Sequence, residues 1–212
     1  MSETLDPPSH PAHEASPKRQ AIVSAAAKLF MANGYGSVSM DAIARAAGVS
    51  KATLYAHFAS KDALFATIIG GKCAAIALEG DTFLTDGEDI GVALNKIGRH
   101  LMHFLVAPET QAMLRVVISE SGRFPEHGAA FLRAGPEKFL ARLREWFAAQ
   151  HEAGRLVVPD AQIAADQFSA LMRPLMFLRA MVAVPPSPTE AEIATTVDAA
   201  VTTFLRAFKP NS

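Results

Sequence analysis

The stretch "ARAAGVSKATLYAHF", residues 44–58, decides the fold of the amino-terminal part of this chain. It contains two short helical patterns separated by a single glycine, Gly48. Glycine adopts the positive φ that a tight turn requires, and the small residues Ala44 and Ala47 let two helix backbones approach closely. The stretch therefore predicts a helix-turn-helix, in which two helices cross steeply through a turn of three or four residues.

The second helix of this motif has two different faces. Ile43, Val49, Leu54 and Phe58 fall at the spacing that ties it to the first helix, and the opposite side carries Ala52, Thr53 and Ala56, flanked by Lys51, Tyr55 and His57. Small side chains let a helix enter a DNA major groove, lysine, hydroxyl and imidazole groups reach phosphates, and a threonine hydroxyl or alanine methyl contacts base edges. An ordinary helical corner with a solvated face would show the same pattern, so both interpretations stay open at this point.

Helix signals continue on both sides of the motif. A helix is predicted over about residues 18–33 with Gly34 after it, and Ser39, Ser50 and Ser60 are placed to cap the next three helices. Farther along, Pro108, Pro125 and Pro136 each suit the first turn of a new helix. A long apolar helix is expected over residues 161–182, kinked at Pro174, and a last helix over about 190–208.

These patterns include no strand signal, so we expect an all-α fold. Its domains are expected to be a flexible tail at residues 1–16, a helix-turn-helix DNA-binding head at 17–65, and a helical bundle for ligand binding and dimerisation at 66–212. The tail is proline-rich and too polar to order itself.

Composition limits the classes of protein. The 212 residues carry a formal net charge of −1, but residues 17–65 hold six basic and two acidic side chains, an excess that suits nucleic acid. Cys73 is the one cysteine, which rules out an internal disulfide framework and favours a reducing cytoplasm. No apolar run is long enough to span a bilayer, so a cytoplasmic protein with no membrane partner is expected.

The wider context of the motif resembles a known family. The segments "RQAIVSAAAKLFMANGYG" (19–36) and "SVSMDAIARAAGVSKATLYAHFASKDALF" (37–65) closely resemble the DNA-binding head of the TetR family of bacterial regulators. In the body, "MLRVVISESGRFPE" (113–126) and "FLARLREWFAAQHEAGRL" (139–156) look like the regulatory part of the subgroup related to AcrR and AefR.

The resemblance implies roles for the matching positions of the head. Ser39 would contact a phosphate, Lys51, Ala52 and Thr53 would enter the major groove, Tyr55 and His57 would grip the DNA backbone, and Lys61 would add a phosphate contact. Ala56 departs from the family pattern, because members often carry a larger aromatic or polar residue at this position.

The resemblance also implies that the body binds a small molecule and forms a dimer through its last two helices. The expected pocket residues are Met102, Phe104, Met113, Val117, Phe131, Phe168, Met172 and Met176, and the expected dimer interface holds Leu171, Leu175, Val201 and Leu205. An ordinary hydrophobic core is the alternative for each pocket residue. Arg173 and Arg179 interrupt an otherwise apolar helix, and the sequence leaves open whether they face a ligand, a salt bridge or the interface.

The sequence supports neither a metal sensor nor an enzyme as well as it supports a regulator. His100 and His103 lie three apart on one helical face, with Glu120, His127 and His151 elsewhere, whereas a metal sensor needs three or four converging ligands. For an enzyme, Ser119, Ser121 and the histidines give no nucleophile–base–orienter order, and there is no glycine-rich phosphate loop.

The sequence is therefore interpreted as a ligand-responsive transcriptional regulator without catalytic residues, cofactor or metal. It is expected to be a homodimeric repressor that leaves its double-stranded DNA operator when a small apolar effector binds. The effector would push the carboxyl half of the fourth helix, which is weakest at Gly70 and Gly71, so that the heads swing apart. A metal-sensing regulator and a DNA-binding scaffold protein without ligand are the alternatives.

Overall fold

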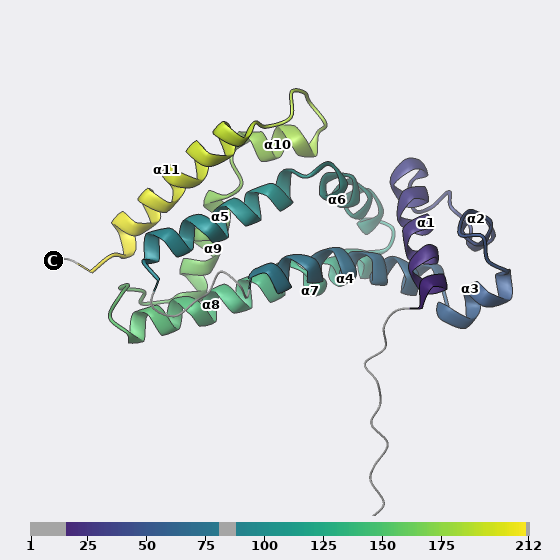
Figure 1. The fold of residues 1–212 in the computed structure, drawn as a ribbon, viewed down its shortest axis with the longest axis horizontal. Coiled ribbons are helices and arrows are strands. Elements are labelled where there is room, and N and C mark those ends of the chain that lie inside the picture. Colours follow the sequence, from purple (N-terminus) through teal and green to yellow (C-terminus); the bar gives the residue numbers. More distant parts are fainter. Residues whose placement is uncertain (1–15, 81–87, 211–212) are drawn as a thin grey trace, which may run out of the picture.

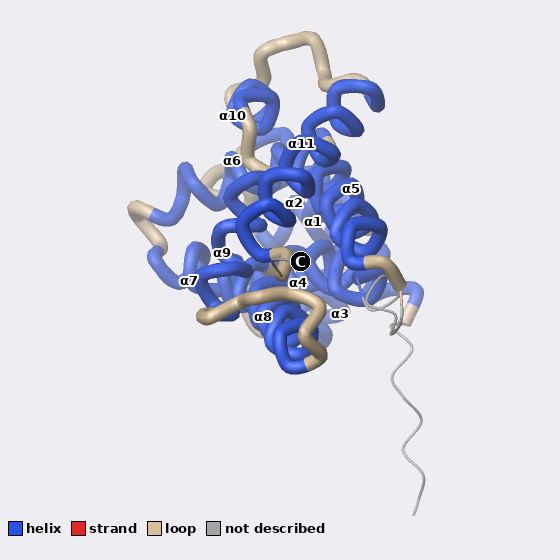
Figure 2. Tube along the Cα trace, turned by 90° about the vertical axis from the view of Figure 1, so that its left-hand side faces the viewer, coloured by secondary structure: helices blue, strands red, loops and turns tan. Residues whose placement is uncertain are grey.

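The computed structural model describes residues 16–80 and 88–210, and within these ranges the chain is all-α, with no strand (Figures 1 and 2). This confirms the predicted fold class. The predicted tail lies outside the described residues, except for Ser16, which caps the first helix. The helices are α1 Pro17–Asn33, α2 Met40–Ala46, α3 Lys51–His57, α4 Lys61–Gly80, α5 Ile90–Val106, α6 Pro108–Ser121, α7 Pro125–Ala134, α8 Pro136–Glu152, α9 Ala161–Leu171, α10 Leu175–Met181 and α11 Glu190–Phe208.

Short local signals set most of these boundaries, as the sequence predicts. The hydroxyls of Ser39, Ser50 and Ser60 each accept a hydrogen bond, 3.1 Å long, from the backbone amide three residues on. Each bond satisfies an amide that has no partner inside its helix. Proline occupies the first turn of α6, α7 and α8, where no amide donor is needed.

The expected kink at Pro174 is a complete break instead. Helix α9 ends at Leu171, and Pro174 is the N-cap of α10. Proline has no amide to donate and disfavours helical geometry in the preceding residue, which explains why the helix ends. The Arg115 guanidinium of α6 donates to the carbonyls of Ala180 and Met181, both at 3.3 Å, and so fixes the end of α10 against α6.

The helices form an elongated molecule with α1, α2 and α3 at one end and the outer end of α11 at the other (Figure 1). Helix α4 leaves the head and runs into the body beside α7, while α5 pairs with α11 and α8 with α9. The view along the long axis shows the same helices gathered into one bundle, with the α10–α11 loop at its edge (Figure 2).

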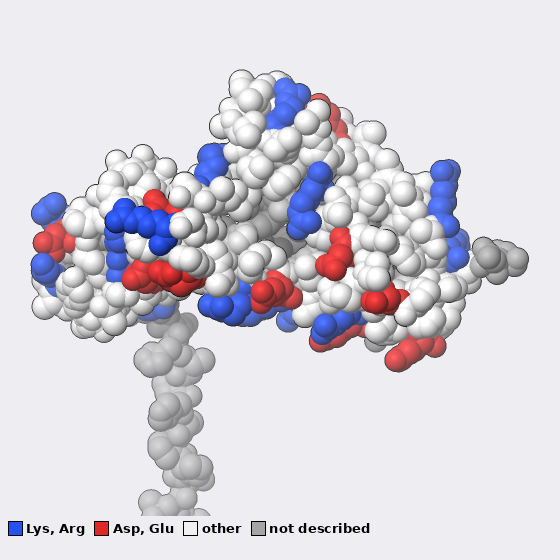
Figure 3. Space-filling model, turned by 180° about the vertical axis from the view of Figure 1, so that it is seen from behind, with Lys and Arg blue, Asp and Glu red and all other residues white. Residues whose placement is uncertain are grey.

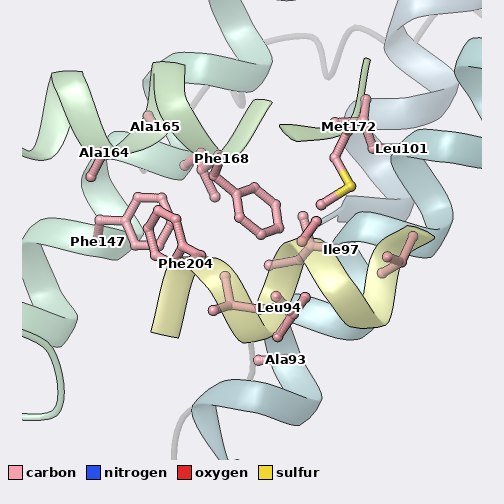
Figure 4. Close-up of a cluster of buried hydrophobic side chains, with 14 of the residues drawn as sticks. Ala93, Leu94, Ile97, Leu101, Phe147, Ala164, Ala165, Phe168, Met172 and Phe204 are labelled. Atoms are coloured by element: carbon pink, nitrogen blue, oxygen red, sulfur yellow. The ribbon is translucent and has the colours of Figure 1, made fainter. Parts of the chain in front are cut away.

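Two clusters of buried apolar side chains hold this arrangement together. One lies in the body, where Phe147 stacks on Phe204 at a centroid distance of 5.0 Å and Phe168 meets Phe204 edge-on at 5.3 Å (Figure 4). The other joins α1–α4 to Met113, Val116 and Val117 of α6. The head and the body therefore share one continuous core at their junction.

The length and hydropathy of the helices bear on membrane insertion. None of the helices in the described residues is, by itself, long and apolar enough to cross a bilayer. Helices α5 and α6 reach the required length and composition only when taken together, with a bend of 63° between them.

Candidate nucleic-acid interface and regulatory cavity

The helix-turn-helix is built as its sequence pattern requires. Gly48 adopts a φ of +67°, and the Val49 amide donates to the Ala44 carbonyl at 3.0 Å, which closes the turn between α2 and α3. Ile43 and Leu54 are fully buried where the two helices cross. Because one face of α3 is fixed in the core, its other face is held in a defined direction.

Helix α3 lies at one end of the molecule (Figure 1). Lys51, Ala52, Tyr55 and Ala56 are exposed, and Thr53 and His57 are half-buried. Tyr55 is 45% exposed on this face. The Thr53 hydroxyl lies 2.8 Å from the Ser50 hydroxyl, so it is held in place at the start of α3.

Lys51 is paired within this face. Its ammonium lies 2.8 Å from an Asp41 carboxylate oxygen, and both side chains are more than half exposed. Hydrogen bonding to Asp41, together with the charge of that carboxylate, raises the pKa of Lys51 above its usual value. Lys51 therefore stays cationic, but its charge is partly balanced while the protein is free.

The Lys61 ammonium contacts the backbone of the head itself. It donates to the carbonyls of Tyr35 and Val38, at 2.9 and 3.0 Å, and lies 4.2 Å from the Tyr35 ring centroid. These bonds fix the α1–α2 loop to the start of α4. The family pattern could not reveal this inward contact because it depends on the path of the loop. Ser39, by contrast, is exposed at the N-terminus of α2, although its hydroxyl caps that helix.

A polar contact links the head to the body directly. The Asp62 carboxylate of α4 accepts hydrogen bonds from the Tyr35 hydroxyl and from His127 Nε2 of α7, the latter at 2.9 Å. His127 is 2% exposed and packs against the rings of Tyr35, Phe65 and Phe124. These two hydrogen bonds hold the pKa of Asp62 below its usual range, whereas burial and the Asp62 contact raise that of Tyr35.

The histidines considered as metal ligands do not converge on one point. His103 faces Glu190 at 3.3 Å, and His151 Nδ1 accepts from the Val158 amide, also at 3.3 Å. Among the described residues, Asp62, Glu126 and His127 do bring potential ligand atoms within 4.8 Å of one another. Asp62 already accepts two hydrogen bonds there, so a metal would have to displace established contacts.

A cavity of about 240 Å³ opens in the body. Its lining comes from α5 to α10 and is dominated by leucine and phenylalanine, with Thr110, Ser169 and Arg173 as its polar residues. From behind, this side of the molecule is hollowed between the head and the far end (Figure 3). The volume lies just below the roughly 300–1,000 Å³ of typical small-molecule sites, so it suits a compact ligand.

The lining overlaps only in part with the predicted pocket. Phe104 and Phe131 border the cavity. Its other lining residues include ones that the sequence did not assign to the pocket: Leu101, Leu105, Thr110, Leu114, Leu132, Gly135, Pro136, Phe139, Leu140, Ser169 and Phe177. Phe168 and Met172 are fully buried in the body core (Figure 4). Met102 is fully buried there as well, and Met176 packs against this core. Met113 and Val117 lie in the cluster beside the head. Helical spacing identified apolar faces, but it does not indicate which turns border a void.

The predicted dimer residues also differ in their surroundings. Val201 is 6% exposed and belongs to the body core, so it is already buried within one chain. Leu171 and Leu205 are half-buried against that core, and Leu175 is 70% exposed. Helices α9 and α11 form a shallow surface groove that is lined by Gln167, Ala170, Leu171, Thr203, Phe204, Ala207 and Phe208.

Two family models together account for most of the chain. Residues 22–68 match the model for bacterial regulatory proteins of the tetR family, and residues 92–210 match the C-terminal domain of AefR-like transcriptional repressors. Among curated relatives, the transcriptional regulator UidR of Escherichia coli is 48% identical over 56 residues. That match spans 26% of this chain and only 29% of the relative. AcrR of Shigella flexneri is 44% identical over 114 residues, 52% of each chain.

Solved structures match over nearly the whole length. A TetR-family regulator from Mesorhizobium loti superposes with a TM-score of 0.84 at 26% identity, covering 94% of this chain and 100% of that one. The flavonoid-responsive regulator FrrA superposes with a TM-score of 0.78 at 35% identity, covering 93% and 100%. By their names, these relatives are regulators. The chain described here belongs to the TetR family of bacterial transcriptional regulators.

Proposed function

We propose that this protein is a cytoplasmic, homodimeric repressor that leaves its operator when a compact, largely apolar molecule fills the body cavity. One observation carries the proposal: α6 forms a wall of the cavity and also part of the core beneath the head. Thr110 and Leu114 border the cavity, while Met113, Val116 and Val117 pack with the head. A ligand that moves α6 therefore has to disturb the packing of the head.

Helix α7 offers a second, parallel connection. Phe131 borders the cavity and also packs partly against the head cluster. One turn earlier, His127 binds Asp62 of α4. A ligand changes DNA affinity only when it binds two arrangements of the protein unequally. The side chains of α6 and α7 provide contacts that would differ between two such arrangements.

For the dimer, the exposed faces of α9 and α11 are the proposed interface. Their groove contains half-buried Leu171 and Phe208 between small and polar side chains. Val201 faces inward, so the interface would use the opposite side of α11, which includes Thr203 and Ala207. In the DNA complex, the two α3 helices would lie about one helical turn apart on a pseudo-palindromic site.

The test measures binding to a duplex selected from random sequence by the purified protein. The flavonoid naringenin and smaller aromatic compounds are titrated into this complex, and release is followed by fluorescence anisotropy. A bound compound should lower the affinity for the duplex about 5- to 150-fold, which corresponds to a typical allosteric coupling. Leu140→Trp, which fills the cavity, should abolish the effect, whereas Val92→Trp, at an exposed position of α5 outside the cavity lining, should leave it unchanged.

Two results would contradict the proposal. One is a compound that binds the native protein but not Leu140→Trp, and therefore occupies the cavity, and yet leaves operator affinity unchanged. The other is release that persists fully in Leu140→Trp. Either result would favour a scaffold protein that binds DNA without a ligand switch.

A further inference from the structure

Among the described residues, the lining of the body cavity contains a basic residue but no acidic one. Of the described lining residues, Arg173 is the one that carries a charge, and Thr110 and Ser169 bear hydroxyls. Thr110 and Ser169 are 6% and 2% exposed to solvent. A cavity that is otherwise made of leucine and phenylalanine therefore holds hydrogen-bonding groups and one positive charge.

Arg173 has no counter-ion within the described residues. No carboxylate or carbonyl among them accepts a hydrogen bond from its guanidinium, and Arg173 is exposed to solvent where it borders the cavity. The other arginine of this segment differs, because Arg179 donates to the Pro185 carbonyl at 3.0 Å. The sequence does not distinguish Arg173 from Arg179, but in the structure only the Arg179 guanidinium has a carbonyl partner among the described residues.

The break at Pro174 explains the position of Arg173. Helix α9 ends at Leu171, and the Arg173 amide donates to the Ala170 carbonyl at 2.9 Å in the final turn. Ser169 and Arg173, four residues apart at this helix end, both border the cavity. Phe177 of α10 lines it from beyond the break. Leucine and phenylalanine would bury the apolar part of a ligand, while guanidinium and hydroxyl would meet an acidic group.

We propose that the effector is an aromatic acid, whose anionic group is bound by Arg173 and whose ring lies among the cavity's phenylalanine and leucine side chains. This inference rests on the proposed effector cavity and narrows its ligand class. A planar guanidinium can donate two parallel hydrogen bonds to a carboxylate. The alternative is an arginine that simply extends its charge into water and covers the cavity mouth with its apolar stem.

The experiment uses two nearly isosteric probes, 2-naphthoate and its neutral amide, 2-naphthamide. Binding of each to the full chain without DNA is measured by calorimetry at neutral pH. Naphthoate should bind about tenfold more tightly than the amide, the effect of one hydrogen bond to a charged group. Arg173→Met should remove this preference, and Arg173→Lys should retain part of it. Arg179→Met is the matched control and should retain all of it.

The ratio of the two affinities is compared within each variant, so a general loss of folding would weaken both probes together and not alter the ratio. Equal or tighter binding of the amide to the native protein would overturn the inference and leave an apolar effector intact. A preference for naphthoate that survives in Arg173→Met would overturn it as well. If neither probe binds the native protein, or if both still bind Leu140→Trp, the inference and the proposed effector cavity both fail.

Discussion

At the residue scale, the structure distinguishes side chains that the sequence treats alike. Lys51 and Lys61 are both basic residues of the head, and the family resemblance gives both a DNA contact. Lys51 is exposed beside α3, whereas Lys61 donates to two backbone carbonyls inside the head. We therefore expect Lys51 to contribute more than Lys61 to the neutralisation of DNA phosphates.

The exposed ion pair of Lys51 and Asp41 predicts opposite effects on DNA binding when either residue is neutralised. Lys51→Met should weaken binding to every duplex and reduce the slope of log affinity against log salt by about 1, because one phosphate contact is lost. Asp41→Asn should strengthen binding, because it removes a competing negative charge from Lys51. Anisotropy titrations at several KCl concentrations measure both. An unchanged slope in Lys51→Met would show that its ammonium does not contact phosphate.

At the scale of single elements, α4 connects the two functional parts. It starts beside the Tyr35 and Val38 carbonyls of the head and runs beside α7 in the body. Gly70 and Gly71 lie within it, and a Cβ added at either position would meet no atom within 4 Å. Glycine lowers helix stability by about 1 kcal/mol relative to alanine, so this is where α4 resists bending least.

We expect Gly70→Ala and Gly71→Ala to raise the melting temperature, since each favours the helix without a steric clash. If effector release requires α4 to bend, both variants should need more effector to leave the operator, with little change in operator affinity itself. Gly122→Ala, at the end of α6 and equally free of contacts, serves as the control. A higher melting temperature with an unchanged effector response would assign the switch to another element.

At the scale of the whole molecule, Asp62 couples the head to the body. It is ionised when it accepts hydrogen bonds from Tyr35 and His127, and both bonds lower its pKa in the folded state. A carboxyl whose pKa falls on folding stabilises the protein above its unfolded pKa, about 3.9 for aspartate. This stabilisation is lost as the pH falls through the lower, folded value.

Asp62→Asn should therefore lower the melting temperature at pH 6–7, and the gap from the native protein should shrink below about pH 4. Calorimetric melting curves from pH 3 to pH 7 measure the gap. Glu126→Gln, at the neighbouring exposed carboxylate, should show no comparable gap at neutral pH. A gap for Asp62→Asn that stays constant down to pH 3 would mean that its ionisation does not stabilise the junction.

The sequence by itself determined the all-α class, the helix-turn-helix and most helix boundaries. These features depend on local interactions: Ser39 and Ser50 cap the helices that follow them, Gly48 permits the turn, and Pro108, Pro125 and Pro136 begin helices. Each such signal acts within a few residues, so it can be identified in a single chain.

Only the tertiary structure decided where the apolar and charged side chains point. Phe168 and Phe139 occupy similar helical patterns, yet one fills the core and the other borders the cavity. Lys61 faces inward because the α1–α2 loop brings two carbonyls to it, and Arg173 borders the cavity because α9 ends before Pro174. These placements depend on contacts between distant segments, and helical periodicity carries no information about which segments meet.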